Sequence, residues 1–178
     1  MFVMKDNPEY LPQLGRLFID FVNTLERCHA LGIVHCDIAL RNLMMSREPV
    51  PPHTTRGCII DWHCAGRFDI AVGEVYRDTN HLSLETSTER YIRERIYRPQ
   101  DDLSALVRCW KIATDMQAYK SVKKWALHSD REVVIGLIVD FWQTQYTDVD
   151  MFAETRNYAA LRDYFSNPLP IPAQPDQT

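Results

Sequence analysis

Three side chains in the first part of the chain have the types and spacing that phosphoryl transfer needs. Asp37 lies in a polar stretch, Asn42 follows it by five residues, and Asp61 ends an apolar stretch. Carboxylate and amide oxygens are the ligands that Mg²⁺ prefers, and phosphate oxygens complete its octahedron. Phosphoryl transfer depends mainly on positioning and charge neutralisation, so few protein groups carry much of it. We therefore expect two of these side chains to hold Mg²⁺ and one carboxylate to lie beside an attacking hydroxyl.

The residues around this set predict a helix, a loop and a short hairpin. Residues 11–31 have helical periodicity, with one apolar face made of Leu14, Leu17, Phe18, Phe21, Val22, Leu25 and Cys28. Gly32 ends this helix, and His29 lies in its last turn. The proline-rich segment at residues 47–55 is typical of a turn or hairpin tip. Gly57–Asp61 is predicted to be a buried strand that ends in an acid.

The second half of the chain is predicted to be largely helical. Pro99 opens a helix whose apolar residues recur at helical spacing, with Asp101 or Asp102 near its N-terminus. Further helices are expected over residues 119–128, 131–146 and 153–165, whereas residues 62–99 read as turn-rich. The aromatic residues at helical spacing are expected to be core and not a cofactor site: Trp110, Phe141 and Trp142.

These elements predict a mainly α fold, a helical bundle with one short β-hairpin between its first two major helices. The chain has 178 residues, enough for one domain with a real core. We assign residues 1–10 to a lead-in, 11–165 to the domain and 166–178 to a proline-rich tail.

The composition of the chain argues against some classes of partner and compartment. The net charge of −4 argues against general nucleic-acid binding, which favours a basic surface. The longest apolar run is too short for a membrane span, and the N-terminus lacks the apolar run of a signal peptide. The five cysteines are odd in number and form no CxxC pair, which favours reduced thiols and an intracellular protein, cytoplasmic or nuclear. The oligomeric state and the partner stay open.

The loop resembles the catalytic loop of the protein-kinase superfamily, His-x-Asp-x-x-x-x-Asn, in the segment HCDIALRN. The resemblance implies that Asp37 is the catalytic base and that Asn42 is a Mg²⁺ ligand. It makes His35 a structural residue under the loop, and Arg41 the residue that neutralises the transferred phosphate, as in many tyrosine kinases. The segment CIIDW resembles the strand before Asp-Phe-Gly, so Asp61 would bind the bridging Mg²⁺ and, with Asn42, ATP.

Two further segments are similar to fungal-type protein-kinase-like domains. Arg77-Asp78-Thr79 resembles the end of an activation segment, which gives Thr79 a supporting role. RPQDDLSALVRCW resembles the buried central helix of the kinase C-terminal lobe, whose Asp, here Asp102, supports the catalytic loop. The resemblance spans about residues 11–146 and implies a kinase-like C-lobe that uses ATP and Mg²⁺.

The sequence also departs from the kinase pattern. Cys36 replaces the loop Arg that reads activation-loop phosphorylation, and Trp62 and His63 replace the Phe and Gly of Asp-Phe-Gly. No Ala-Pro-Glu follows. Before Leu11 we find no glycine-rich loop, strand Lys or helix Glu, so an N-terminal lobe is expected to be absent and the chain to be truncated.

Three functions therefore remain open. The first is ATP- and Mg²⁺-dependent phosphotransfer to a protein hydroxyl, Ser/Thr or Tyr. The second is a non-catalytic, pseudokinase-type module that docks on a partner such as another kinase. The third is a small-molecule phosphotransferase of the aminoglycoside or choline type, in which Ile-Asp-Trp also occurs. Four arginines could bind a phosphate or an acidic substrate, but we expect them to form a solvated charged face: Arg90, Arg93, Arg95 and Arg98. Cys36 and Cys64 lie near the motifs, and we expect them to be inert thiols.

Overall fold

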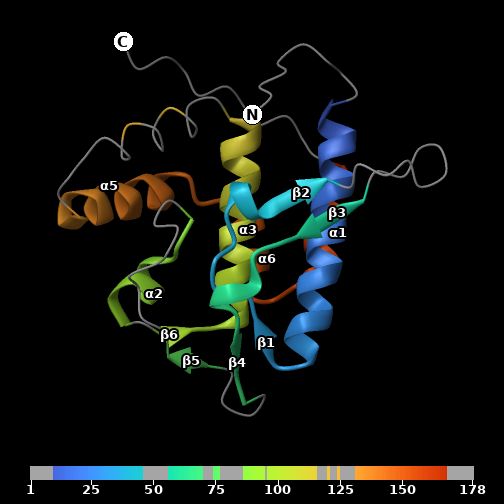
Figure 1. The fold of residues 1–178 in the computed structure, drawn as a ribbon. Helices are drawn as coiled ribbons and strands as arrows, with labels where there is room; N and C mark the ends of the chain where they lie inside the picture. The colour runs from blue at the N-terminus through green and yellow to red at the C-terminus, as the bar shows by residue number, and fades with distance from the viewer. Residues whose placement is uncertain are drawn as a thin grey trace, which may run out of the picture.

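Two long helices, α1 (Tyr10–Ala30) and α3 (Pro99–Thr114), run side by side in opposite directions at the centre of the fold (Figure 1). The computed structural model describes residues 10–45, 56–69, 74–76, 86–94, 96–115, 120, 124 and 131–167. Within them, helices predominate and the strands form three two-stranded antiparallel sheets. The prediction of a mainly α fold is confirmed.

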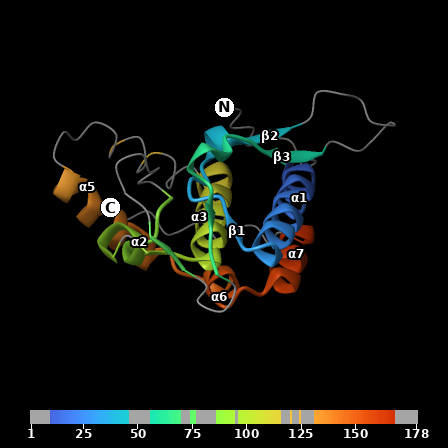
Figure 2. The same ribbon diagram turned by 60° about the horizontal axis from the view of Figure 1, so that its bottom comes forward.

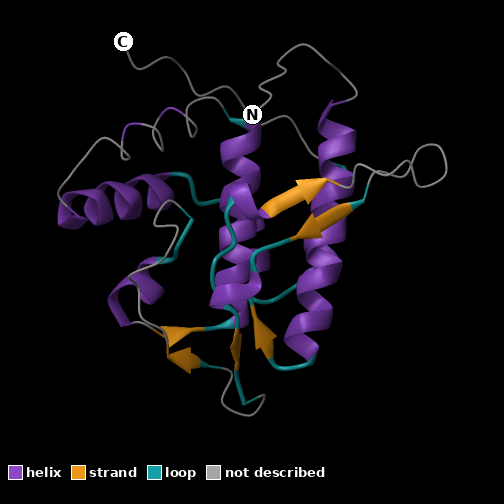
Figure 3. Cartoon of the chain, viewed as in Figure 1, coloured by secondary structure: helices purple, strands orange, loops and turns teal. Residues whose placement is uncertain are grey.

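The segment between α1 and α3 holds the strands. Near the C-terminal end of α1, β1 (Ile33–Val34) pairs with β4 (Gly66–Arg67). The predicted hairpin consists of β2 (Leu43–Met45) and β3 (Gly57–Ile59), with Leu43 opposite Ile59, and spans from α3 to α1 (Figure 3). In the stretch predicted as turn-rich, the described residues form short elements. They are η2 (Trp62–Cys64), β4, β5 (Val75–Tyr76), α2 (Glu89–Glu94) and β6 (Ile96–Tyr97), with β5 paired to β6.

Of the C-terminal helices, α6 (Asp148–Glu154) packs against α3 and α7 (Tyr158–Ser166) packs against α1, whereas α5 (Arg131–Thr144) extends away from them (Figure 2). A single helix over residues 153–165 was the wrong prediction. Arg156 adopts a left-handed backbone conformation with φ 54°, and the Asn157 side chain then accepts the Ala160 amide to cap α7. This turn and cap interrupt the helical backbone, so two helices form in place of one.

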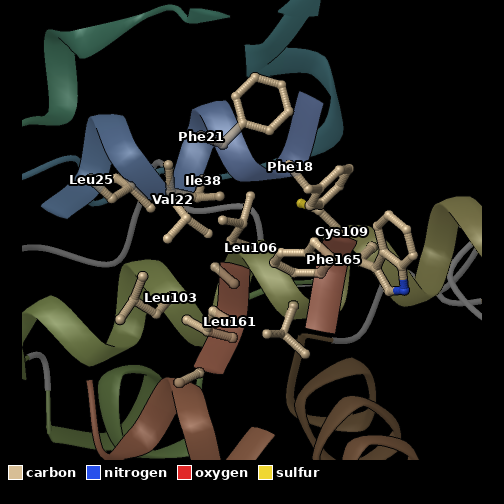
Figure 4. Packing of buried hydrophobic residues seen from close by; sticks show 14 of the residues in the cluster. Phe18, Phe21, Val22, Leu25, Ile38, Leu103, Leu106, Cys109, Leu161 and Phe165 are labelled. Carbon is tan, nitrogen blue, oxygen red and sulfur yellow. The ribbon is translucent and has the colours of Figure 1, made fainter. Parts of the chain in front are cut away.

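The core lies between α1, α3 and α7 (Figure 4). Phe18, Trp110 and Phe165 come from these three helices, and their ring centroids lie 5.0–5.3 Å apart. Trp110 is fully buried, as its spacing predicted. Gly15 allows the close approach of α1 to α7, since a Cβ built on it would lie 2.1 Å from the Phe165 carbonyl oxygen. Trp142 is also buried, in a second cluster with Ile112 and Ile138, where Phe141 is partly buried.

The strand β3 is less buried than its apolar sequence predicted. Ile59 is buried, but Cys58 and Ile60 are exposed. A two-stranded ribbon has only one face against α1, so alternate side chains point to solvent. No helix in the described part of the chain is both long and apolar enough to cross a bilayer. Most of the predicted helix over residues 119–128 falls outside the described residues, and its two described residues, 120 and 124, are helical. Residues 1–9 of the lead-in and most of the proline-rich tail also fall outside the description, and Tyr10 of the lead-in begins α1.

Candidate active site

Asp37 and Asn42 lie against each other at the centre of the loop that follows β1. The turn η1 (Leu40–Asn42) folds the chain back, so that the Asn42 Nδ2 donates to the Asp37 carbonyl oxygen at 2.8 Å and to its Oδ2 at 3.0 Å. Both residues are buried. Because the Asn42 Nδ2 donates to Asp37, the Oδ1 of the same amide faces away from the Asp37 carboxylate.

Arg41 completes this group from the same turn. Its Nη2 lies 3.1 Å from Asp37 Oδ1 and 2.8 Å from Oδ2. The Arg41 side chain is 53% exposed, whereas that of Asp37 is 2% exposed. A buried carboxylate is thus connected to solvent through an exposed guanidinium, which places a positive charge beside Asp37.

Asp102, near the start of α3, holds the backbone of the loop. Its carboxylate accepts four hydrogen bonds, from the His35 amide at 2.8 Å, the Cys36 amide at 3.1 Å, the Tyr97 hydroxyl at 2.7 Å and His29 Nε2 at 2.9 Å. The Cys36 backbone has φ 66°, a costly conformation for a residue with a side chain. The hydrogen bonds from the His35 and Cys36 amides to Asp102 stabilise this turn immediately before Asp37.

The charge on Asp102 is stabilised by these donors. Burial by itself would raise the pKa of Asp102, but the hydrogen bond and charge of His29, with the bonds from His35 and Tyr97, lower the pKa overall. Burial and the neighbouring Asp102 carboxylate raise the pKa of Tyr97 well above its usual value, so its hydroxyl stays protonated and donates. An ionised carboxylate surrounded by fixed donors gives the loop a rigid anchor.

The two neighbouring acids at the start of α3 have different roles. The sequence allowed either acid to cap this helix. Asp101 does so, since its carboxylate accepts the Arg98 amide at 2.7 Å and its own amide donates to the Arg98 carbonyl oxygen at 2.9 Å. Asp102, one residue further on, instead faces the loop and is fully buried.

Asp61 is joined to the same loop through its neighbour Ile60. The Ile60 amide donates to the Asn42 carbonyl oxygen at 2.9 Å, and His35 Nε2 lies 3.0 Å from the Ile60 carbonyl oxygen. His35 is fully buried and packs edge-on against Trp62, with ring centroids 4.6 Å apart. The strand end that carries Asp61 is therefore held beside Asn42 by backbone contacts.

The Asp61 side chain itself lies in a more open setting. Asp61 has a left-handed backbone with φ 64°, and its side chain is 46% exposed. One carboxylate oxygen contacts His63 Nδ1, and His63 Nε2 lies 3.1 Å from the Cys64 Sγ. All five cysteines lie in the described part of the chain, and none forms a disulfide, which agrees with the expectation of thiols.

The donor set suits a hard cation that brings its own further ligands. The Asn42 amide oxygen and the Asp61 carboxylate are hard oxygen donors, which Mg²⁺ prefers. Within the described residues, no group of three or more His, Cys, Asp or Glu side chains could hold a metal alone. Mg²⁺ commonly binds through one or two protein oxygens plus phosphate and water oxygens, and both of these side chains offer an oxygen of that type.

Other predicted residues are separate from this group or fall outside the description. The segment Arg77-Asp78-Thr79 and Arg95 lie outside the described residues, as does the side chain of Arg90. Arg98 forms an ion pair with Glu74, and Arg93 is exposed. The exposure of Arg93 agrees with a solvated charged face, whereas Arg98 is partly buried against Glu74 and does not.

Four residues at the loop were not predicted from the sequence. His29, Tyr97 and Tyr158 extend the Asp102 network, with His29 Nδ1 at 2.7 Å from the Tyr158 hydroxyl. The Thr86 hydroxyl donates to the Ile38 carbonyl oxygen at 2.6 Å, next to Asp37. Only His29 carried a signal, because it follows Leu25 by four residues and so lies on the apolar face of α1.

Comparisons with known proteins leave the family open. No protein-family model matches the sequence, and no curated protein is significantly similar to it.

Proposed function

We propose that this chain is a C-terminal lobe of the protein-kinase type, which takes part in phosphoryl transfer from ATP to a protein hydroxyl. The observation that carries the proposal is the mutual fixing of Asp37 and Asn42 in a loop whose backbone amides are held by Asp102. Such an arrangement supports this chemistry because phosphoryl transfer depends on fixed positions of a few polar groups.

Each residue of the loop has a role in this proposal. Asp37 accepts the proton of the substrate hydroxyl and orients its oxygen. Arg41, the exposed cation beside Asp37, offsets negative charge on the transferred phosphoryl group. Asn42 and Asp61 would hold Mg²⁺, which when bound neutralises the phosphate charge. His35 holds the strand end of Asp61 against the loop through the Ile60 carbonyl oxygen.

The test is phosphate transfer from radiolabelled ATP to a panel of proteins and peptides, with wild type and two matched variants. Asp37→Asn removes the proton acceptor, so we expect transfer to fall by about 10²-fold or more. Asp163→Asn, an exposed change on α7, is expected to leave transfer unchanged. Transfer that is equal in wild type and Asp37→Asn would contradict the proposal.

A non-catalytic binding module is the second candidate, and one contact favours it. The His63 imidazole contacts the Asp61 carboxylate, so one of the two expected Mg²⁺ ligands already has a protein partner. A thermal-shift titration with Mg-ATP separates the two candidates, because a ligand that binds the folded state raises the melting temperature. A rise that Asp61→Asn abolishes favours the phosphotransferase. No rise in wild type, together with no transfer, favours the binding module.

A further inference from the structure

A second polar site lies away from the candidate active site, between α3, α5 and α6. α5 extends away from one side of α3, and α6 lies near the start of α3 (Figure 2). The side chains between them enclose a pocket of about 390 Å³. This size is within the range of small-molecule pockets, about 300–1,000 Å³. None of the loop residues Asp37, Asn42 or Asp61 lines it.

One wall of this pocket is apolar and carries a cation. Ile138, Val139 and Trp142 line it from α5, and Ile138 and Trp142 are almost fully buried. The Arg108 guanidinium, from α3, lies over the Trp142 ring at 5.2 Å from its centroid. The cation–π contact fixes the guanidinium against the wall but satisfies none of its N–H groups.

Arg108 has donor capacity to spare. Within the described residues it donates to one acceptor, the Ser87 carbonyl oxygen, and forms no salt bridge. A guanidinium has five N–H donors, so Arg108, which lines the pocket, has more donors than the described residues have acceptors for it. Burial lowers the pKa of Arg108 to about 10, against the opposite effect of Asp150, Asp101 and Glu154. The group is therefore still a cation at neutral pH.

Glu154 is the corresponding anion. Its Oε2 accepts the Tyr146 hydroxyl at 2.9 Å, and its Oε1 has no donor among the residues that the structure describes. The other two acids of the pocket are already engaged. Asp101 accepts the Thr88 hydroxyl and the Arg98 amide, and Asp150 pairs with Lys111. The pocket thus presents one under-used cation, one under-used carboxylate and an apolar wall.

We propose that this pocket binds a free α-amino acid with an apolar side chain. The ligand carboxylate would accept from Arg108, its ammonium would donate to Glu154, and its side chain would pack on Val139 and on the exposed ring of Tyr146, which also line the pocket. A phosphate or a dicarboxylate suits the pocket less well, because Asp101, Asp150 and Glu154 repel a second negative charge. The proposal is independent of the phosphotransfer function, and its test uses no nucleotide.

Isothermal titration with L-leucine and two analogues tests the charge requirement. Leucinamide lacks the carboxylate, and 4-methylpentanoic acid lacks the ammonium. We expect each to bind at least about tenfold more weakly than L-leucine, since a charged hydrogen bond of this kind is worth that much affinity. Failure of L-leucine, L-methionine and L-phenylalanine all to bind would overturn the proposal, as would leucinamide binding as tightly as L-leucine.

Variants of Arg108 and Glu154 test which residue binds the carboxylate and which binds the ammonium of the ligand. Glu154→Gln, an exposed change, is expected to bring L-leucine down to the affinity of 4-methylpentanoic acid and to leave that of the acid unchanged. Glu132→Gln, the same change on the exposed side of α5, should alter neither. Arg108→Gln should weaken both ligands, with circular dichroism checking that the variant is folded. If Glu154→Gln preserves the preference for L-leucine, the assignment is wrong.

Discussion

Two carboxylate–histidine pairs in this protein have the same chemistry and opposite surroundings. Asp102 and His29 are 73 residues apart in sequence, with side chains 0% and 1% exposed. Asp61 and His63 are two residues apart, with side chains 46% and 62% exposed. The first pair joins α1 to α3 and the loop, whereas the second joins neighbours within η2. A carboxylate–histidine contact of this protein therefore organises the fold where several elements converge on it and water is excluded, as at Asp102.

Changing either acid to asparagine should affect stability very differently at the two pairs. Asp102→Asn leaves His29 and the loop amides facing an amide group in a buried site, so we expect a loss of about 3–5 kcal/mol in the free energy of unfolding. Asp61→Asn keeps a side chain that tolerates the left-handed backbone, and should change stability by no more than about 0.5 kcal/mol. Urea unfolding measures both, and equal losses would contradict the difference.

The buried pair of Asp102 and His29 depends on the packing of α1, which carries His29, against α7. Substitutions at two glycines test this packing. Gly15→Ala places a methyl group 2.1 Å from the Phe165 carbonyl oxygen and pushes these helices apart, so we expect a loss of about 1–3 kcal/mol. Gly136→Ala, on α5, meets nothing within 4 Å and should stabilise the protein by about 0.5–1 kcal/mol. Thermal unfolding of the two variants should shift in opposite directions.

Acid pH is a milder way to weaken the buried pair. The folded-state pKa of Asp102 is lower than that in the unfolded chain, about 3.9. Its ionised form therefore stabilises the fold above that pH, and this stability is lost as pH falls through the folded-state pKa. We expect the stability gap between wild type and Asp102→Asn to be constant from about pH 7 to 5 and to shrink below about pH 4. Urea unfolding across this range would show a gap that widens in acid if this assignment is wrong.

The elements with strong local patterns agree with their sequence predictions. The apolar stripes of α1, α3 and α5 repeat at helical spacing over several turns. α1 and α5 begin and end within two residues of the expected bounds, and α3 begins at Pro99 as expected. The prediction was wrong for α6 and α7, where the left-handed Arg156 and the Asn157 cap separate two short helices. Helix periodicity continues across such a turn in the sequence, so a pattern alone does not reveal the break.

The residues available for chemistry near Asp37 can be read from the sequence, because Asn42 follows Asp37 by five residues and the turn between them is local. That Asp102, Tyr97, His29 and Tyr158 come together beside the loop, and that Arg108 and Glu154 line one pocket, is visible only in the folded protein. Hydrogen bonds between residues far apart in the chain depend on how the helices pack. Side-chain periodicity specifies which face of each helix is buried but not which polar residue lies opposite.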